Sequence, residues 1–383
     1  MHKYLVYAAY GLLTFGGVMH FLVDVVAQYA RGKRVPGPAT TLYYGLNTAY
    51  ALSQVLFGLM ALLIIACRDA QKGEQAAQRL REAGGNVKVL PLDLASQTSI
   101  RAFVEGFRRG QFPPLAGIVC NAGMQNVATP TRTEEGYETT FAVNHLGHYL
   151  LTRLLLPELA SDARITFVSS GTHDPKQKTG MPEPLYITAD ALAHDFETSP
   201  KAGRRRYTTS KLCNVYCTYE YARRLAASSD PRLQSLRVNA FDPGLMPATD
   251  LARTYSAPLR FVSRYVLPAL SLFVSNIQSP ATSGRRLALL ASGGEGSATG
   301  KYFSDGREIQ PSAASYDTQN ALDLWNTSAQ MTGLPSELSL ATPQPLTNGG
   351  STTSKAPSDG GFNEEEKKPR LTLLGRAISY FEP

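Results

Sequence analysis

The segments "LAGIVCNAG" (residues 115–123) and "ARITFVSS" (163–170) stand on either side of the longer segment "YETTFAVNHLGHYLLTRLLLPEL" (137–159). Each short segment is an apolar run that ends in polar or turn-forming residues, as buried strands do. The long segment has the length and the apolar content of a helix. A strand, a helix and a second strand in this order predict two parallel strands joined by a crossover helix.

The same alternation extends in both directions along the chain. Upstream, "LLIIACRD" (62–69) and "NVKVLPLDL" (86–94) are predicted strands, and each precedes a predicted helix. Downstream come a predicted helix over 207–226, the strand "LRVNAFDPG" (236–244) and the segment "GKYFSDG" (300–306). This pattern predicts the α/β class, with a Rossmann-like, doubly wound parallel sheet.

The bulk composition excludes several classes of protein. The 383 residues are sufficient for one large α/β domain with additions at both ends. The net charge of +7 is not gathered into a basic stripe interleaved with aromatic residues, so we expect no nucleic-acid partner. The four cysteines form no disulfide framework, and the sequence indicates no metal site.

The N-terminal part of the chain (1–66) is predicted to be a membrane segment. Residues 4–28 are mostly apolar and exceed the about 20 residues that cross a bilayer. Residues 42–66 carry no charge, and their composition favours a second membrane helix. The alternative is that residues 40–67 form a degraded strand–turn–helix–strand unit behind a single span. The positive-inside bias favours one span, because two spans would place the basic loop after residue 28 and the domain on opposite sides of the membrane.

The reductase-like domain itself is predicted to span 67–335. Residues 336–383 are rich in Ser, Thr, Pro, Gly and Asn, which predicts a flexible tail. At its end, "LTLLGRAISYF" (371–381) carries apolar residues at helical spacing and predicts a short amphipathic helix.

Tyr207 and Lys211 are the strongest candidates for chemistry. They are four residues apart on a predicted helix and therefore project from one face. A free tyrosine titrates near about 10, and a fixed positive charge favours its phenolate, so the pair predicts a tuned acid–base group. Ser170 ends a predicted strand, where its hydroxyl can bond a substrate carbonyl. Asn144 lies within a predicted helix, where a polar side chain can hold a water.

Two turns are predicted at the same edge of the sheet as Ser170. Asn121-Ala122-Gly123 ends one strand, and Pro243-Gly244 ends another. Ligands bind beyond the carboxyl ends of parallel strands, and glycine lets the backbone approach a cofactor closely. These turns are therefore candidate cofactor contacts.

Taken together, over residues 65–335, these features resemble the short-chain dehydrogenase/reductase family. The segments "ACRDAQKG", "NHLGHYLLTRLLLPEL", "YTTSKLCNVY" and "LWNTSAQMTGL" are most similar to the branch of retinol dehydrogenases and light-dependent protochlorophyllide reductases. The resemblance implies that Tyr207 is the proton donor and that Lys211 binds the nicotinamide ribose and lowers the tyrosine pKa. It also implies that Ser170 positions the reacting carbonyl or double bond and that Asn144 anchors a proton-relay water.

The resemblance further implies a set of cofactor contacts. Asn121, Ala122 and Gly123 would line the adenosine half, and Asp93 would meet the adenine. The backbone after Pro243-Gly244, together with Thr249, would close over the nicotinamide. Arg68 follows the strand at 62–67, where an arginine favours the 2′-phosphate of NADP, so NADPH is expected to be preferred over NADH.

The glycine-rich phosphate turn of the family is the part that matches least. The best placement, residues 44–51, retains only Gly45 as a contact for the pyrophosphate. If residues 42–66 form one continuous helix, the sheet lacks its usual first strand–turn–helix, and the affinity for NADP is expected to be poor.

We therefore expect a membrane-associated oxidoreductase that transfers a hydride between NADP(H) and a lipophilic carbonyl, alcohol or conjugated double bond. Its catalytic domain is expected to face the cytoplasm. Family members often form dimers or tetramers through the helices that contain Asn144 and Tyr207, which suggests a homo-oligomer. The alternative is a non-catalytic membrane protein that carries a decayed or recombined reductase domain with impaired cofactor binding.

Overall fold

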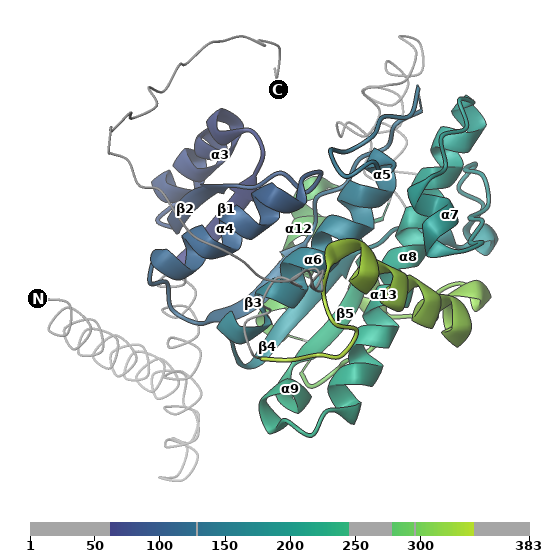
Figure 1. The fold of residues 1–383 in the computed structure, drawn as a ribbon. Coiled ribbons are helices and arrows are strands. Elements are labelled where there is room, and N and C mark those ends of the chain that lie inside the picture. The colour runs from purple at the N-terminus through teal and green to yellow at the C-terminus, as the bar shows by residue number, and fades with distance from the viewer. Residues whose placement is uncertain (1–61, 128, 245–277, 295, 341–383) are drawn as a thin grey trace, which may run out of the picture. The chain divides into compact units, whose positions relative to one another are not determined.

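The computed structural model describes residues 62–127, 129–244, 278–294 and 296–340, and Figure 1 shows how their helices and strands are arranged. The strands are β1 (Leu62–Cys67), β2 (Asn86–Pro91), β3 (Leu115–Cys120), β4 (Leu159–Val168), β5 (Arg237–Asp242), β6 (Lys301–Ser304) and β7 (Arg307–Glu308). Neighbouring strands are parallel except β6 and β7. The predicted α/β class with a parallel, Rossmann-like sheet is confirmed.

Helices connect the strands and cover the sheet. The α-helices are α3 (Ala70–Glu82), α4 (Gln97–Arg109), α5 (Thr139–Phe141), α6 (Gly147–Leu154), α7 (Ala189–Ala193), α8 (Pro200–Ala227), α9 (Pro231–Ser235), α12 (Pro280–Ser292) and α13 (Thr318–Thr332). The short helical turns are η1 (Ala142–Leu146, a π-helix), η2 (Leu156–Glu158), η3 (Gly171–His173), η4 (Pro175–Gln177) and η7 (Ala313–Tyr316). In Figure 1, α6 and α13 lie in front of the five-stranded sheet and α12 lies behind it.

Strand β1 corrects one prediction from the sequence. The helix predicted over 42–66 is wrong for residues 62–66, because these residues belong to strand β1 and pair in parallel with residues 86–90 of β2. The β-branched Ile64 and Ile65 favour an extended backbone, and the parallel partner supplies the hydrogen bonds that a helix would have made internally. The domain therefore includes residues from 62 onward, rather than from 67.

Helix α3 packs closely on these two strands. Gly73 faces the sheet, and a Cβ at this position would overlap Cys67 Sγ and Val89 Cγ1. The helix begins at Asp69, whose carboxylate accepts the backbone N–H of Lys72 at 3.1 Å. Strands β1 and β2 and helix α3 thus form one tightly joined unit.

Within the described residues the parallel strands form two separate sheets. Strand β1 pairs with β2, whereas β3, β4, β5, β6 and β7 form a five-stranded sheet in that order. The segment predicted either as a second membrane helix or as a degraded first strand–turn–helix lies outside the described residues up to residue 61, as does the predicted span over 4–28. Among the helices that the structure describes, none combines the length and the apolarity needed to cross a bilayer.

The main core lies between the five-stranded sheet and helices α4, α6 and α8. Its fully buried side chains include Ile165 and Phe167 of β4, Leu150 of α6 and Tyr221 of α8. The predicted boundary at residue 335 is too early, because the side chains of Leu338 and Leu340 pack against this core. Residues 341–383 of the flexible tail predicted over 336–383, with its amphipathic helix, lie outside the described residues.

Candidate active site

The candidate site lies where three strands of the five-stranded sheet end. Asn121-Ala122-Gly123 follows β3, Ser169-Ser170 follows β4, and Pro243-Gly244 follows β5. Because these strands are parallel, their carboxyl ends meet at one edge. The backbone N–H of Ser169 donates to Phe241 O at 2.7 Å, which extends the pairing of β4 and β5 up to this edge.

Helix α8 brings Tyr207 and Lys211 to this edge. The helix begins at Pro200, seven residues before the predicted start at 207, because the Ser199 side chain caps it and Pro200 suits the first turn. Lys211 Nζ lies 5.6 Å from the centroid of the Tyr207 ring. Both side chains are buried, so the predicted pairing on one helix face is what the structure shows.

Lys211 is also tied to the end of β4. Its Nζ donates to Val168 O at 3.1 Å, and Asn214 Nδ2 donates to the same carbonyl oxygen at 3.0 Å. The hydroxyl of Ser169 donates in the other direction, to Lys211 O at 2.8 Å. Burial lowers the pKa of Lys211 to about 8, while the negative charge of Asp242 acts in the opposite direction.

Asn144 joins the turn after β3 to α8. It lies in the π-helical turn η1, a rare conformation that is frequent at functional sites. Its Oδ1 accepts the backbone N–H of Met124 at 2.7 Å, and its Nδ2 donates to Met124 O at 2.9 Å and to the hydroxyl of Ser210 at 2.9 Å. Both N–H groups of the amide are therefore used within the protein, so a relay water would have to be held by an Asn144 oxygen.

Ser170 has a hydroxyl that can still donate a hydrogen bond. Its Oγ accepts the backbone N–H of Thr172 at 3.3 Å, which leaves the hydroxyl proton to a substrate oxygen. Its carbonyl oxygen accepts Nδ1–H of His173 at 2.6 Å. His173 Nε2 accepts the backbone N–H of Ser312 at 3.2 Å, so the ring fixes the Ser170 backbone to a distant part of the chain.

The turn after β3 has the form of a cofactor cradle. Asn121, Ala122 and Gly123 are exposed. A Cβ at position 123 would lie 3.3 Å from Lys211 Nζ, which is a tight contact, and 3.5 Å from Asn144 Oδ1, which is an ordinary one, so a side chain here would crowd the lysine. This geometry fits a nicotinamide cofactor that lies against the backbone.

The other predicted cofactor contacts are more dispersed. Arg68 follows β1, is exposed, and makes no hydrogen bond or ion pair with the described residues. Asp93 lies after β2, where its Oδ1 accepts the backbone N–H of Ala95 at 2.9 Å. Gly244 has φ of +75°, and its N–H donates to Asp242 Oδ1 at 3.0 Å. Gly45 and Thr249 lie outside the described residues.

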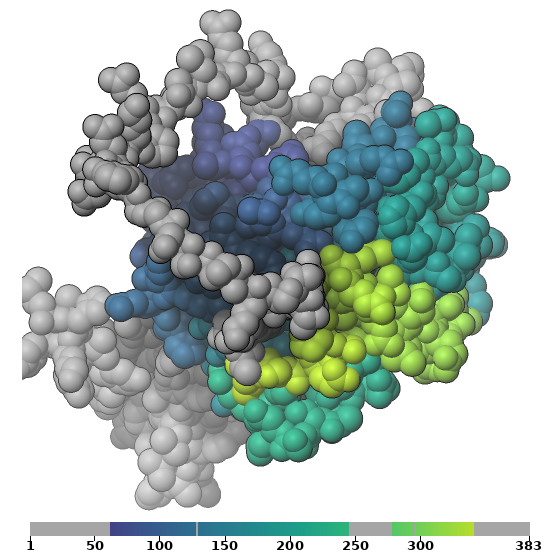
Figure 2. Space-filling view, viewed as in Figure 1, coloured from purple at the N-terminus to yellow at the C-terminus, as the bar shows by residue number. Residues whose placement is uncertain are grey.

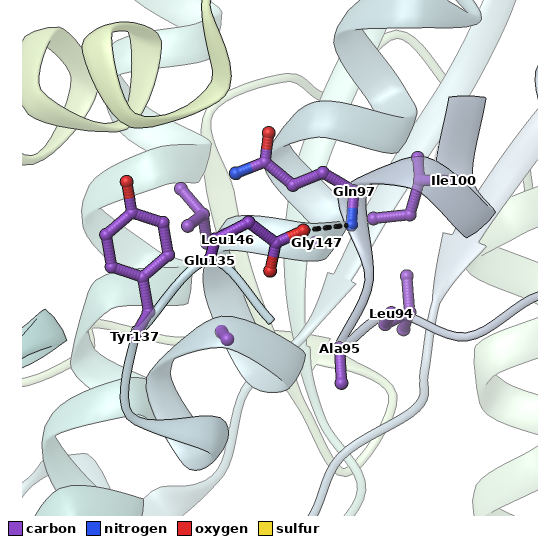
Figure 3. A pocket seen from close by; sticks show the side chains of 9 residues that line it. Leu94, Ala95, Gln97, Ile100, Glu135, Tyr137, Leu146 and Gly147 are labelled. Carbon is purple, nitrogen blue, oxygen red and sulfur yellow. Dashed lines mark hydrogen bonds between the residues drawn. The ribbon is translucent and has the colours of Figure 1, made fainter. Parts of the chain in front are cut away.

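Two hollows in the described part of the chain lie away from these residues. Figure 3 shows one at the start of α4, where Glu135 accepts the backbone N–H of Gln97 at 2.8 Å; its volume of about 10 Å³ is too small for a cofactor or a substrate. The other, of about 490 Å³, lies between Tyr219, Tyr316 and the β6–β7 hairpin. A third hollow, of about 10 Å³, lies beside Arg206, Thr209 and Ser210 of α8. None of the three is lined by the predicted tetrad, so the side chains at the strand ends locate the site.

Several residues of the site are not singled out by the sequence. Ser210 binds Asn144, and Asn214 shares a carbonyl oxygen with Lys211. Asp242 lies beside Gly171, and its charge acts on Lys211. Ser210 and Asn214 belong to "TTSKLCN", so their helical spacing from Tyr207 and Lys211 is a signal that could have found them. Asp242 immediately precedes the predicted Pro243-Gly244 turn, and a carboxylate at the end of a buried strand is a signal that could have found it.

Comparison with known proteins gives consistent matches. Residues 45–182 match the sequence profile described as short chain dehydrogenase. The chain is 34% identical over 298 residues to a protochlorophyllide reductase of Avena sativa, covering 71% of this chain and 91% of that protein. It is 33% identical over 312 residues to retinol dehydrogenase 14 of Mus musculus, covering 77% and 86%. A third relative, protochlorophyllide reductase A of Triticum aestivum, is 32% identical over 296 residues, covering 71% and 74%.

Proposed function

We propose that this chain, which belongs to the short-chain dehydrogenase/reductase family, is an oxidoreductase that transfers a hydride between NADP(H) and a lipophilic carbonyl, alcohol or conjugated double bond. The observation that carries the proposal is the meeting of Tyr207, Lys211 and Ser170 at one edge of the sheet, with Asn144 bonded to the same helix. Each of these groups has a chemical role that follows from its surroundings.

Tyr207 is the proposed general acid–base group. In the reductive direction the phenol donates a proton to the substrate oxygen or carbon atom that becomes protonated. In the oxidative direction its phenolate accepts a proton from the alcohol. The ammonium of Lys211, 5.6 Å from the ring centroid, favours the phenolate over the neutral phenol. The hydroxyl of Ser170 donates to the substrate oxygen and holds it in reach of Tyr207.

The cofactor contacts follow from the same geometry. When bound, the nicotinamide cofactor supplies or accepts the hydride. Lys211 would bind its ribose hydroxyls, and the exposed backbone of Asn121-Ala122-Gly123 would lie against its adenosine half. Arg68 would pair with the 2′-phosphate, which supports a preference for NADPH over NADH.

The substrate class is proposed from two independent features. The matched relatives are named for protochlorophyllide and retinol, which are both large and mainly apolar molecules. The sequence of this chain adds the apolar segment over 4–28, which is long enough to cross a bilayer. A membrane-anchored enzyme whose domain faces the cytoplasm would meet such substrates where they dissolve.

Residues 45–61 bear on the number of membrane spans. The family profile match begins at residue 45, so these residues align with the reductase rather than with an unrelated segment. Together with strand β1 at Leu62–Cys67, this supports a single span over 4–28 followed by a degraded first strand–turn–helix. Cysteine labelling from each side of the membrane, with single cysteines introduced at Lys3 and Lys33 of a cysteine-free chain, tests this: labelling of the two positions from the same side would contradict one span.

Titration of the purified full-length protein with NADPH, followed by cofactor fluorescence, tests the proposed function. Saturable binding, and oxidation of NADPH with an apolar aldehyde or enone, are expected. The sequence supports one alternative, because residues 44–51 retain a single glycine of the phosphate turn. A protein that binds neither NADPH nor NADH at millimolar concentration would be a non-catalytic member of the family.

A further inference from the structure

A buried carboxylate at the end of β5 has no part in the roles described above. Asp242 is 7% exposed. Its Oδ1 accepts the backbone N–H of Gly244 at 3.0 Å, and its Oδ2 accepts the hydroxyl of Ser304 at 3.0 Å. Gly171 lies on another side, where a Cβ would be 3.2 Å from Oδ2. The carboxylate is therefore held in one orientation within the edge of the sheet.

The strand register places Asp242 one residue beyond the level at which Lys211 binds β4. Lys211 Nζ donates to Val168 O at 3.1 Å. Val168 is in register with Phe241, the residue immediately before Asp242. Burial of the Lys211 side chain disfavours its ammonium and lowers its pKa, and the charge of Asp242 is the influence that raises it.

Other titratable groups facing Lys211 cannot replace this charge. His148 of α6 donates from Nδ1 to Asn144 O at 3.2 Å, and burial lowers its pKa to about 4, with Lys211 contributing in the same direction. It is therefore neutral near pH 7. Tyr207 is the group whose phenolate the Lys211 ammonium favours. Among the described residues, Asp242 is thus the negatively charged group that acts on Lys211, and it does so through space rather than through a direct ion pair.

We propose that Asp242 is a positioning residue whose fixed negative charge keeps Lys211 in its ammonium form beneath Tyr207. The inference rests on the proposed function, because the charge on Lys211 matters there through its effect on the tyrosine. Without the carboxylate, the buried amine gives up its proton to solvent at a lower pH. Tyr207 then loses the positive charge that favours its phenolate, although the tyrosine itself stays in place.

The variant Asp242→Asn tests this directly, because it keeps the shape of the side chain and an acceptor for Gly244 N–H. The deprotonation midpoint of Lys211 is measured in the full-length protein with ¹³Cε-labelled lysine, and its resonance is assigned by loss in Lys211→Arg. In Asp242→Asn we expect the midpoint to fall by about one pH unit or more. An unchanged midpoint would overturn the proposal.

Asp174→Asn is the matched control. Asp174 is also buried, and it acts on His173 and Tyr302 rather than on Lys211. Its removal should leave the Lys211 midpoint where it is in the wild-type protein. An equal fall in both variants would mean a general disturbance of the fold and would also overturn the specific role of Asp242.

The measurement is separable from the proposed function, because it needs neither cofactor nor substrate. A wild-type protein without reductase activity would contradict the proposed function, while the Lys211 midpoint could still be compared. In an active enzyme, the alkaline limb of kcat should move to lower pH in Asp242→Asn, with KM little changed. Asp242→Ser serves as a second neutral variant, and failure of both variants to fold would assign the carboxylate to the stability of the β5 turn and reject the proposal.

Discussion

At the scale of single residues, Lys211 connects three parts of the candidate site. Its ammonium lies below the Tyr207 ring, its Nζ donates to Val168 O, and a Cβ on Gly123 would crowd it. The spacing of Tyr207 and Lys211 is visible in the sequence because helix geometry places residues four apart on one face. The contacts of Asn144 with Met124 and Ser210 are not visible, because they depend on how the turn after β3 meets α8.

The variant Tyr207→Phe should lose reductase activity by about 10²-fold or more, since general acid catalysis typically contributes 10²–10⁴-fold. The ring stays in place, so the unfolding midpoint should change little. Steady-state turnover, combined with a thermal unfolding curve, measures both effects. Wild-type turnover in this variant would remove Tyr207 from the mechanism.

The variant Arg68→Asp should weaken NADPH binding more than NADH binding. The exposed guanidinium is the proposed partner of the 2′-phosphate, which NADH lacks. Dissociation constants for the two cofactors measure the difference. Arg79→Asp is the charge-matched control, because Arg79 is an exposed residue further along α3. An equal loss of affinity for both cofactors in Arg68→Asp would show that Arg68 does not bind the 2′-phosphate.

At the scale of elements, the strands and their order could be predicted because buried parallel strands are short apolar runs. Three details could not. The apolar sequence of residues 62–66 suits a helix and a strand equally well, and pairing with β2 makes it a strand. The segment 137–159 reads as one helix, whereas a π-turn interrupts it at Asn144 and β4 already begins at Leu159. Helix α8 starts at Pro200, in a polar stretch without apolar periodicity.

Glycines at helix contacts give a prediction at this scale. Gly147 begins α6, and a Cβ there would overlap the carbonyl oxygen of Leu94, a backbone atom that cannot turn away. Gly147→Ala should therefore destabilise the protein by about 1–3 kcal/mol. Gly106→Ala in α4 is the control, because a Cβ there meets no atom within 4 Å.

Urea unfolding of the two variants measures the difference. Gly106→Ala should be neutral or gain up to about 1 kcal/mol, because alanine favours a helix interior over glycine. Equal stability of Gly147→Ala and the wild-type protein would mean that α6 does not lie so close to the turn after β2.

At the scale of the whole molecule, α13 covers the helices through which family members often associate. In Figure 2, α13 lies against the surface formed by α7 and α8. Trp325 of α13 is 1% exposed and meets Tyr149 of α6 and Tyr221 of α8 edge to face, with centroid distances of 5.0 Å to each ring. All eight residues of α6 are buried. An association through α6 and α8 would therefore require α13 to move away, and we expect any oligomer to use other surfaces.

Trp325 also anchors the end of the domain, since its Nε1–H donates to Ser336 O at 2.7 Å. Arg224 Nη1 donates to the same carbonyl oxygen at 2.8 Å. Trp325→Ala should cost about 3–5 kcal/mol of unfolding free energy, as for other large buried side chains. Trp325→Phe should cost less, because it keeps a ring between Tyr149 and Tyr221. Denaturant titration measures both variants, and equal stability of Trp325→Ala and wild type would contradict this packing.

The central claim is that this chain moves a hydride between a nicotinamide cofactor and a lipophilic molecule with the help of Tyr207 and Lys211. The most direct test is a single-turnover reaction of the purified full-length protein with 4-deuterated NADPH, both C4 stereoisomers in turn, and an apolar retinoid aldehyde or conjugated enone. Mass spectrometry of the product should show one deuterium with one of the two stereoisomers, and Tyr207→Phe should form this product at a rate lower by about 10²-fold or more. Absence of deuterated product from the wild-type protein, with no saturable NADPH binding, would contradict the account and identify the chain as a non-catalytic member of its family.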